Sequence, residues 1–246
     1  MIIGSNIQFY ESLQSTNSSA SLSLKEKELP EGTVIFTDFQ TAGKGQQGKR
    51  WESEKGKNLL FSVILYPLSV SPDNQFLISM IISLGICDFL RELVPEVKIK
   101  WPNDIYVNND KIAGILIENS IIGDTIESSI TGIGININQE KFSPDIPNPV
   151  SLKIITGKDT DTGTALENLL NYLDKRYKQL LYGDRGLIRD EYASMLYQAG
   201  EWHTYRSEGI IFKGRIQGIT DSGSLKIEKE DSSVSEFSFK EVDYIH

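Results

Sequence analysis

The segment KIKWPNDIYVNNDKIAGILIEN, residues 98–119, contains the features from which the fold and the chemistry of this chain are inferred. Its β-branched and aromatic residues are typical of strands, and the central NNDK predicts a hairpin turn between two of them. Pro102 restricts the backbone around it, so Asn103 and Asp104 are held in one orientation at the end of a strand. Gly114 interrupts an otherwise apolar strand, which indicates a bulge or the close approach of a ligand.

Lys111 leads the second strand of this segment, where the following residues are apolar. A buried ammonium group is costly unless it has a partner. In a structural ion pair the partner would be Asp104 or Glu118, and in a binding cleft it would be an anion. The residues alone leave both interpretations open.

The composition narrows the classes of protein to consider. The chain has 246 residues, of which 39% are hydrophobic, enough for one large domain or a medium domain with a small addition. Its formal net charge of −9 argues against nucleic-acid or membrane binding over the whole surface. Cys87 is the only cysteine, which excludes an intrachain disulfide and a cysteine zinc cluster. The two histidines, His203 and His246, do not suggest a metal pair or a Ser-His-Asp triad.

Strands and helices alternate over the first 200 residues. Strands are predicted at residues 33–39, 58–66, 97–101, 111–119 and 128–137, and helices at residues 73–93, from about 166 to 183, and from about 187 to 197. Cys87 falls on the apolar face of the first of these helices, where a buried side chain is expected. Ser15 is suited to cap a helix at Ser-Thr-Asn.

After Gly200 the pattern changes to short alternating strands, at residues 209–219, 224–228 and 235–245. We therefore predict a main domain at residues 1–200 and a small all-β domain at residues 201–246. The N-terminal segment has no signal-peptide pattern, and no stretch is expected to be long and apolar enough to span a bilayer. These features predict a soluble cytoplasmic protein that does not bind membranes.

The sequence GKGQQG, residues 43–48, matches the G-x-G-x-x-G pattern of dinucleotide-binding proteins. That pattern should open a helix, whereas the residues after Gly48 show no helical period and lead into another strand. A P-loop is also excluded, because no serine or threonine follows a Gly-Lys pair. Between Gly43 and Lys57 there are five basic residues and two acidic ones, and Trp51 ends the glycine-rich part. A plain surface loop and a loop that closes over an anionic, ring-containing ligand both fit these residues.

Five motifs occur in the order and approximate spacing found in the biotin–protein ligases. They are STN at residues 15–17, QTAGKGQQGKRW at 40–51, KWPND at 100–104, KIAGIL at 111–116 and GIGINI at 132–137. Each motif alone is weakly diagnostic, but five in order are specific. The small C-terminal β-domain is also similar to one in that family, so the chain resembles the biotin–protein ligases over nearly its whole length.

The resemblance implies an α/β fold of the α+β type, with a mixed-sheet, class II synthetase-like catalytic domain and a small C-terminal SH3-like β-barrel. It implies a ligase that uses ATP to convert biotin to biotinyl-5′-AMP and then transfers biotin to one lysine of a biotin carboxyl carrier protein domain of a carboxylase. Positive charge and Mg²⁺ are needed where the carboxylate of biotin meets the α-phosphate.

The resemblance also implies roles for individual residues. Lys111 corresponds to the catalytic lysine at the joined carboxylate and phosphate. Contacts with biotin are implied for Ser15, Thr16, Asn17, Gln40, Gly43, Lys44, Gly45, Gln46, Lys111 and Gly132. Contacts with ATP or the adenylate are implied for Lys44, Gln46, Lys49, Trp51, Asn103, Asp104 and Asn136. Mg²⁺ is expected to arrive with ATP, near Asp104, rather than in a site made by the protein alone.

The glycine loop departs from the family pattern. Lys44 takes the first basic position, Gln46 replaces an arginine that is often found there, and Gln47 is also neutral. The missing guanidinium removes one charge-assisted contact, so the loop is expected to hold the adenylate less tightly, with Lys49 and Arg50 as compensating charges. The glycine loop, taken from Gly43 to Lys57, is expected to be mobile without ligand.

Many members of the family carry an N-terminal winged helix that binds DNA. The STN motif begins at Ser15, which leaves no room for such a domain, so no DNA binding is expected. A monomer and a homodimer both remain open. Two other functions are alternatives: a lipoate or octanoate ligase or transferase of the same fold, and a non-catalytic binder of biotin or nucleotide. KWPND, the glycine loop and the β-domain favour biotin.

Overall fold

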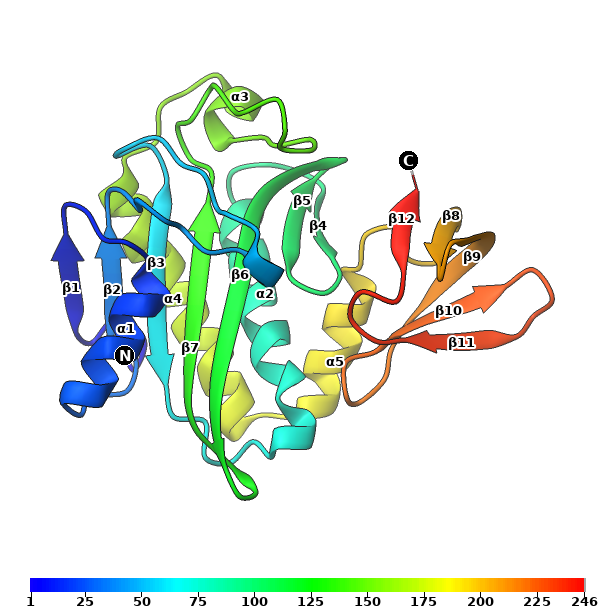
Figure 1. Cartoon of the computed structure of the whole chain (residues 1–246), viewed down its shortest axis with the longest axis horizontal. Coiled ribbons are helices and arrows are strands. Elements are labelled where there is room, and N and C mark those ends of the chain that lie inside the picture. The colour runs from blue at the N-terminus through cyan, green and yellow to red at the C-terminus, as the bar shows by residue number, and fades with distance from the viewer. Residues whose placement is uncertain (246) are drawn as a thin grey trace.

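A computed structural model describes residues 1–245; His246 and the side chain of Gln47 lie outside the description. Within the described residues, a seven-stranded sheet and a five-stranded sheet lie next to each other (Figure 1). The order of the larger sheet is β1 (Ile7–Tyr10), β2 (Val34–Thr37), β3 (Leu59–Leu65), β7 (Thr125–Ile135), β6 (Asp110–Ile122), β5 (Asp104–Val107) and β4 (Val97–Lys100). β1 pairs with β2 in parallel, and all other neighbours are antiparallel, so the expected mixed sheet is confirmed.

Helices cover both faces of the larger sheet (Figure 1). On one face lie α1 (Thr16–Glu26) and the glycine loop, which contains the 3-10 turn η1 (Gln46–Gly48). On the other face lie α2 (Phe76–Arg91), preceded by the 3-10 turn η2 (Pro72–Asn74), then α4 (Thr162–Tyr182) and α5 (Arg185–Ser194). The short α3 (Leu152–Thr156) lies at the end of the sheet at which β7 ends. The main apolar core therefore fills the layer between the sheet and α2 and α4.

α2 is apolar on most of its surface because it packs against the sheet, α4 and α5 together. Pro72–Arg91 is long and apolar enough to cross a membrane, so the expectation that no stretch has this property was wrong. In the folded chain 72% of that apolar window is buried, which explains its composition as that of a core helix. Cys87 is buried there as predicted, and burial raises the pKa of its thiol.

The predicted end of the second helix at Gly183 agrees with the structure, whereas α4 begins at Thr162 and not at about residue 166 as predicted. Asp161 and Gly183 cap the two ends of α4, and Ser15 caps α1 by accepting a hydrogen bond from Ser18 N. α5 begins earlier than predicted, at Arg185, because Asp184 caps it, and it ends at Ser194. The prediction missed four short elements: β1, β5, α3 and β8 (Trp202–Ser207).

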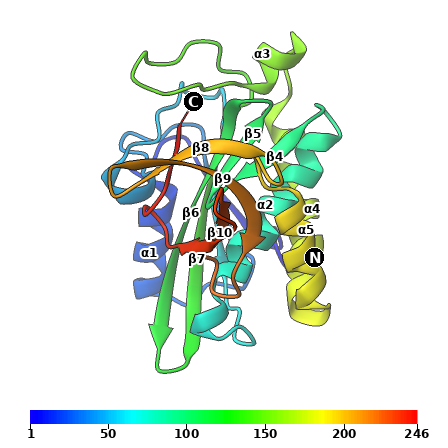
Figure 2. The ribbon, with the colours of Figure 1, turned by 90° about the vertical axis from the view of Figure 1, so that its right-hand side faces the viewer.

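The smaller sheet has the order β11 (Val234–Phe237), β10 (Leu225–Lys229), β9 (Ile210–Ile219), β8 and β12 (Asp243–Ile245). The strand predicted at 235–245 is two strands, because the chain turns at Ser238, where its N–H donates to Glu241. β11 and β12 then lie on opposite edges of this sheet, which faces the viewer in Figure 2. The domain boundary at residue 200 stays a prediction.

Candidate active site

Two adjoining cavities meet on the face of the larger sheet that carries α1 and the glycine loop. The smaller is lined by Ser15, Thr16, Asn17, Gln40, Lys44, Gly45, Gln46, Trp51, Asn103, Lys111, Gly114, Ile115, Leu116, Gly132, Ile133 and Gly134. The larger lies between the loop, β5 and the smaller sheet, and it shares five of these residues: Gly45, Gln46, Trp51, Asn103 and Lys111. The shared residues mark the place where two ligands could meet.

The first turn of α1 forms the polar end of the smaller cavity. The N–H of Thr16 donates to Oε1 of Gln40 at 2.8 Å, which ties the helix start to the segment that leads into the loop. Asn17 Nδ2 donates to Glu118 Oε2 at 2.7 Å and to the carbonyl of Leu116 at 3.2 Å. The side chain of Ser15 is used as a helix cap, and it lines the cavity as well.

Gly132 is necessary for this arrangement. A Cβ at that position would clash with Oδ1 of Asn17. Ser62 is the cross-strand neighbour of Gly132, and its hydroxyl oxygen lies 2.6 Å from the same Oδ1 and 2.7 Å from Thr16 Oγ1. Gly132 thus allows the Asn17 side chain to lie flat on the sheet.

The glycine loop folds into a narrow hairpin. Lys44 and Arg50 form a β-bridge, Gly45 N donates to the carbonyl of Lys49 at 2.7 Å, and Trp51 N donates to the carbonyl of Gly43 at 3.0 Å. After η1 the chain leads into β3 without a helix, which confirms that the dinucleotide-binding interpretation was rightly rejected.

Trp51 holds this hairpin against the sheet. Gly114 on β6 and Gly134 on β7 are cross-strand partners, and a Cβ on either would lie within 2.9 Å of the indole. The pair therefore forms a flat surface for the ring. The indole Nε1 is buried and has no hydrogen-bond partner among the described residues. The predicted mobility of the free loop stays a prediction.

Lys111 lies beside this indole. Its ammonium is 2.8 Å from Asp104 Oδ1 and 5.7 Å from the centre of the Trp51 ring. Both charged side chains remain partly exposed, at 28% and 24%. The structural ion pair and the cavity position that the sequence left as alternatives are therefore both present.

KWPND positions the groups next to Lys111. The Trp101–Pro102 peptide is cis. Asn103 and Ile115 exchange hydrogen bonds, Asn103 Nδ2 donating to the carbonyl of Ile115 and Ile115 N to that of Asn103, both at 3.0 Å. Asp104 begins β5 opposite Gly114.

The larger cavity has walls from both sheets. The main sheet and its loops contribute Lys49, Arg50, Asn136 and Asp104. The smaller sheet and the turn before β12 contribute Arg206, Phe239, Lys240, Asp243 and Tyr244.

Lys100 lies among three tyrosine rings in this cavity. Its ammonium is 4.8 Å from the ring centre of Tyr106, 4.9 Å from that of Tyr244 and 6.0 Å from that of Tyr197. Burial lowers the pKa of Lys100, and the nearby charge of Asp104 opposes that shift.

The structure brings most of the predicted site residues together, with one exception. Gly43 lines neither cavity; it closes the base of the loop, where a Cβ would lie 2.5 Å from the Trp51 carbonyl. Asn136 lines only the larger cavity, with Nδ2 donating to the carbonyl of Val150 at 3.0 Å. Among residues 1–245 no group of three or more His, Cys, Asp or Glu side chains could hold a metal ion.

Sequence reasoning missed Ser62, Glu118 as a partner of Asn17, and the residues of the smaller sheet. Ser62 could have been singled out from the sequence, because it is the one polar residue in LLFSVIL. The residues of the smaller sheet could not have been recognised in this way, because their local sequence is the same whether the strand lines a cavity or faces solvent.

The comparisons with known proteins agree with this geometry. A model of the biotin/lipoate A/B protein ligase family matches residues 9–136, more than half of the chain. The chain belongs to this family. The matched span covers STN, the glycine loop, KWPND, Lys111 and Gly132.

Other family members are similar over most of the chain. The bifunctional ligase/repressor BirA of Bacillus subtilis is 31% identical over 238 residues, which are 94% of this chain and 71% of that protein. A biotin–[acetyl-CoA-carboxylase] ligase of Paracoccus denitrificans is 30% identical over 198 residues, 78% of this chain and 82% of that protein. The structure of biotin protein ligase from Aquifex aeolicus in complex with biotin and ATP has a TM-score of 0.81 and 27% identity, covering 98% of this chain and 99% of that one. The resemblance to the biotin–protein ligases is therefore confirmed.

Proposed function

We propose that this protein is a biotin–protein ligase that activates biotin with ATP and transfers it to a lysine of a carrier protein. The observation that carries the proposal is the position of Lys111, which lines both cavities at the place where they meet. A reaction between two anionic groups needs a fixed cation at the point of bond formation. The names of the relatives from Paracoccus and Aquifex support biotin as the substrate.

In the first step the carboxylate of biotin attacks the α-phosphate, and pyrophosphate leaves. The smaller cavity suits the biotin ring, because polar groups of Thr16, Asn17 and Gln40 lie at one end and Lys111 at the other. The larger cavity suits ATP, because Lys49, Arg50 and Lys100 supply positive charge along it. Mg²⁺ would arrive with the phosphate oxygens of ATP and would neutralise phosphate charge, and Asp104, one of the carboxylates that line this cavity together with Glu52, Asp145 and Asp243, would help to hold it.

In the second step a lysine amine of the carrier attacks the acyl carbon of biotinyl-AMP, and AMP leaves. Trp51 and the loop hairpin cover the cavity and exclude water from the mixed anhydride. A carrier domain of a biotin-dependent carboxylase is the partner that this chemistry requires. The net charge of −9 argues against DNA as a partner of this chain.

The test is to incubate the purified protein with MgATP and biotin, lipoate or octanoate, and to follow pyrophosphate release and the mass of the bound product. We expect biotinyl-AMP from biotin alone, and a carrier domain added afterwards to gain one biotinyl group. Activation of lipoate or octanoate in preference to biotin would assign the protein to the other branch of its family. Binding of biotin without pyrophosphate release would make it a non-catalytic binder.

A further inference from the structure

A chain of hydrogen bonds crosses the polar end of the smaller cavity, from Glu118 on β6 through Asn17 on α1 to Ser62 on β3 and Thr16. Asn17, Ser62 and Thr16 are each at most 4% exposed, whereas Glu118 at the end of this chain of hydrogen bonds is exposed. Among the three buried groups each hydrogen goes to one acceptor, so the position of one donor determines the next.

Glu118 and the carbonyl of Leu116 together determine how the Asn17 amide is oriented, and Glu118 makes the shorter contact. A carboxylate and a backbone carbonyl only accept hydrogen bonds. Glu118 Oε2 lies 2.7 Å from Asn17 Nδ2 and the carbonyl oxygen of Leu116 lies 3.2 Å from it, so the NH₂ group faces these two acceptors. Oδ1 of Asn17 must then point across Gly132 toward Ser62.

The orientation of Asn17 determines the direction of the next two hydrogen bonds. Oδ1 can only accept, so the single hydroxyl hydrogen of Ser62 is used over the 2.6 Å contact with Asn17. The 2.7 Å contact between Ser62 and Thr16 then has to use the hydroxyl hydrogen of Thr16. Gln40 Oε1, which accepts from the backbone N–H of Thr16 at 2.8 Å, lies farther from that hydroxyl, at 3.2 Å, and so competes for its hydrogen only weakly.

Thr16 Oγ1 is therefore an acceptor with no hydrogen left for a ligand in the cavity. A ligand that reaches it must bring an N–H, which the ureido ring of biotin has and which lipoate and octanoate lack. A buried polar group that finds no partner is costly, so this arrangement discriminates against rings without an N–H.

We propose that Glu118 is a positioning residue that makes Thr16 an acceptor for a ligand N–H, and so selects a ureido ring without contacting it. This inference rests on the proposed biotin ligase function. With Glu118→Gln the amide introduced at position 118 can donate as well as accept, so the shorter of the two contacts no longer fixes Asn17, and only the Leu116 carbonyl at 3.2 Å still opposes its turning over. In the turned-over form Ser62 donates to Thr16. The hydroxyl hydrogen of Thr16 then points at the ligand, so that two donors, this O–H and the N–H of the ring, face each other.

The first experiment compares wild type, Glu118→Gln and the control Glu127→Gln. Glu127 is an exposed carboxylate on the adjoining strand β7 that accepts a hydrogen bond from Ser120, so its replacement changes the charge equally, away from Asn17. We expect Glu118→Gln to raise the Kd and KM for biotin about tenfold and to leave kcat within about twofold, since only ring recognition is altered. Glu127→Gln should match wild type.

A second experiment exchanges donor and acceptor. Asn17→Asp places two carboxylates against each other, and we expect biotin binding to weaken about a hundredfold. In the double variant Asn17→Asp/Glu118→Gln the amide introduced at position 118 can donate to the carboxylate introduced at position 17, whose other oxygen still accepts from Ser62. We expect the double variant to bind biotin at least about tenfold more tightly than Asn17→Asp alone. Thermal unfolding of every variant shows whether it folds.

The outcomes separate this inference from the proposed function. A wild type that neither binds biotin nor forms biotinyl-AMP overturns both. A wild type that does so, with Glu118→Gln indistinguishable from it or with no gain in the double variant, overturns the role of Glu118 alone. A tenfold loss that appears in kcat and not in KM also overturns it, because that pattern is one of catalysis and not of ring binding.

Discussion

Lys111 is held on two sides, by the carboxylate of Asp104 and by the ring of Trp51. Neither contact buries the ammonium fully, and the side chain retains 28% exposure. The ion pair positions the charge, and the open side leaves it available to a second anion. A structural partner and a catalytic role are therefore compatible at this residue.

The first prediction is that Lys111→Ala slows biotinyl-AMP formation by about 10²–10³, the usual cost of removing one group that stabilises developing charge. The fold should survive, because Asp104 is partly exposed and can be hydrated without the lysine. Lys153→Ala is the matched control: Lys153 also pairs with carboxylates, Glu140 and Asp159, but lines neither cavity. Single-turnover pyrophosphate release measures the rate, and a near-wild-type rate in Lys111→Ala contradicts the assigned role.

The second prediction concerns Gln46, which lines both cavities and whose buried Oε1 has no hydrogen-bond partner among the described residues. Gln46→Arg supplies a guanidinium fork to the phosphate, so the half-life of bound biotinyl-AMP should lengthen. Gln8→Arg on β1 adds the same charge away from both cavities and should leave the half-life unchanged. An unchanged or shorter half-life in Gln46→Arg would mean that this position does not bind the adenylate.

Among the elements, one arginine joins three helices behind the sheet. Arg176 on α4 makes bidentate contacts with Asp88 on α2 and with Glu191 on α5, at 2.6 to 2.9 Å. Its side chain is only 11% exposed. These helices support the strands that carry Lys111 and Gly132, so this cluster supports the site indirectly.

The third prediction is that Arg176→Met lowers the free energy of unfolding by roughly 3 kcal/mol, because two carboxylates lose their shared partner. Arg189→Met is the control from α5: Arg189 pairs with Asp221, which is 89% exposed, and its loss should cost less than about 1 kcal/mol. Urea unfolding measures both. Equal losses in the two variants would contradict the special position of Arg176.

The fourth prediction follows from the pKa of Glu191, which the hydrogen bond from Arg176 lowers. A carboxyl group with a lowered folded pKa stabilises the fold above its unfolded pKa, about 4.3 for glutamate. That stabilisation is lost as the pH falls through the folded pKa. The difference in unfolding free energy between wild type and Arg176→Met should therefore be full at pH 7 and shrink below about pH 4. A difference that is constant from about pH 7 to pH 3 would contradict this.

In the molecule as a whole, the two sheets meet at the turn after β9. The carbonyl of Gly223 accepts a hydrogen bond from Trp101 Nε1 at 2.8 Å, and a Cβ on Gly223 would clash with the ring of Phe76 at the start of α2. Its φ of +95° is also in the region that favours glycine. This turn connects KWPND with the smaller sheet, which supplies part of the larger cavity.

The fifth prediction is that Gly223→Ala loosens the contact between the sheets and raises the KM for ATP more than the KM for biotin, since only the larger cavity has walls from both. Gly123→Ala is the control: its φ of +56° is also positive, but a Cβ there meets nothing within 4 Å. Limited proteolysis around residue 200 and the two KM values measure the effect. Equal increases in both KM values would contradict a role confined to the larger cavity.

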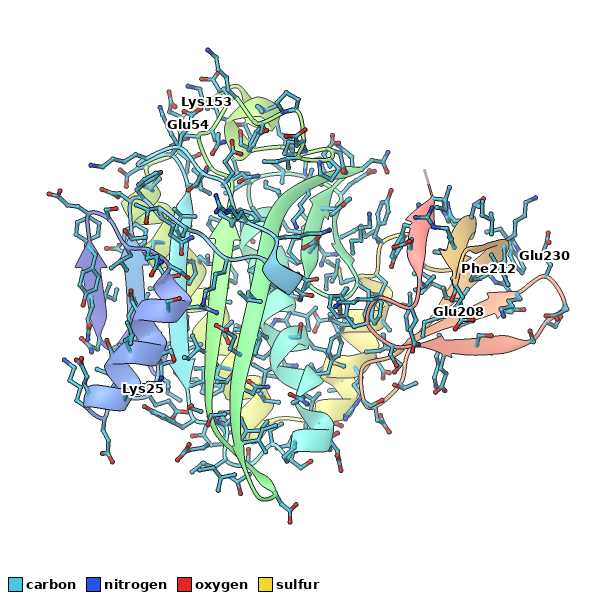
Figure 3. The ribbon with its side chains drawn as sticks, in the orientation of Figure 1. Lys25, Glu54, Lys153, Glu208, Phe212 and Glu230 are labelled. Atoms are coloured by element: carbon cyan, nitrogen blue, oxygen red, sulfur yellow. The ribbon has the colours of Figure 1, made fainter. Side chains whose placement is uncertain are left out.

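Two side chains labelled in Figure 3 show that residues far apart in the sequence lie close together in the structure. Glu54, near the end of the glycine loop, and Lys153, on α3, lie together at one end of the larger sheet. The contacts agree: Glu54 N donates to Gln139, and Lys153 pairs with the neighbouring Glu140. Such proximity is set by the strand order and not by spacing along the chain.

Features that depend on local chemistry could be predicted from the amino-acid sequence. Ser15 and Gly183 cap helices as predicted, and the β-branched runs formed β2, β3, β6 and β7. The absence of a helical period after Gly48 was enough to exclude a dinucleotide fold. β1 and β5 were missed, because each is a four-residue strand directly between polar residues, whereas the equally short β2 lies in the longer β-branched and aromatic run of residues 33–39.

Which groups face one another depends instead on how the elements pack. Asn17 and Glu118 are 101 residues apart, and they meet because β3, β7 and β6 pair in one register; a slip of one residue would turn Ser62 and Gly132 to the opposite face. The same holds for Trp51 on Gly114 and Gly134, and for the smaller sheet as a wall of the larger cavity. Residue types are local properties of the chain, whereas hydrogen-bond partners and cavity walls arise from long-range packing that no local pattern encodes.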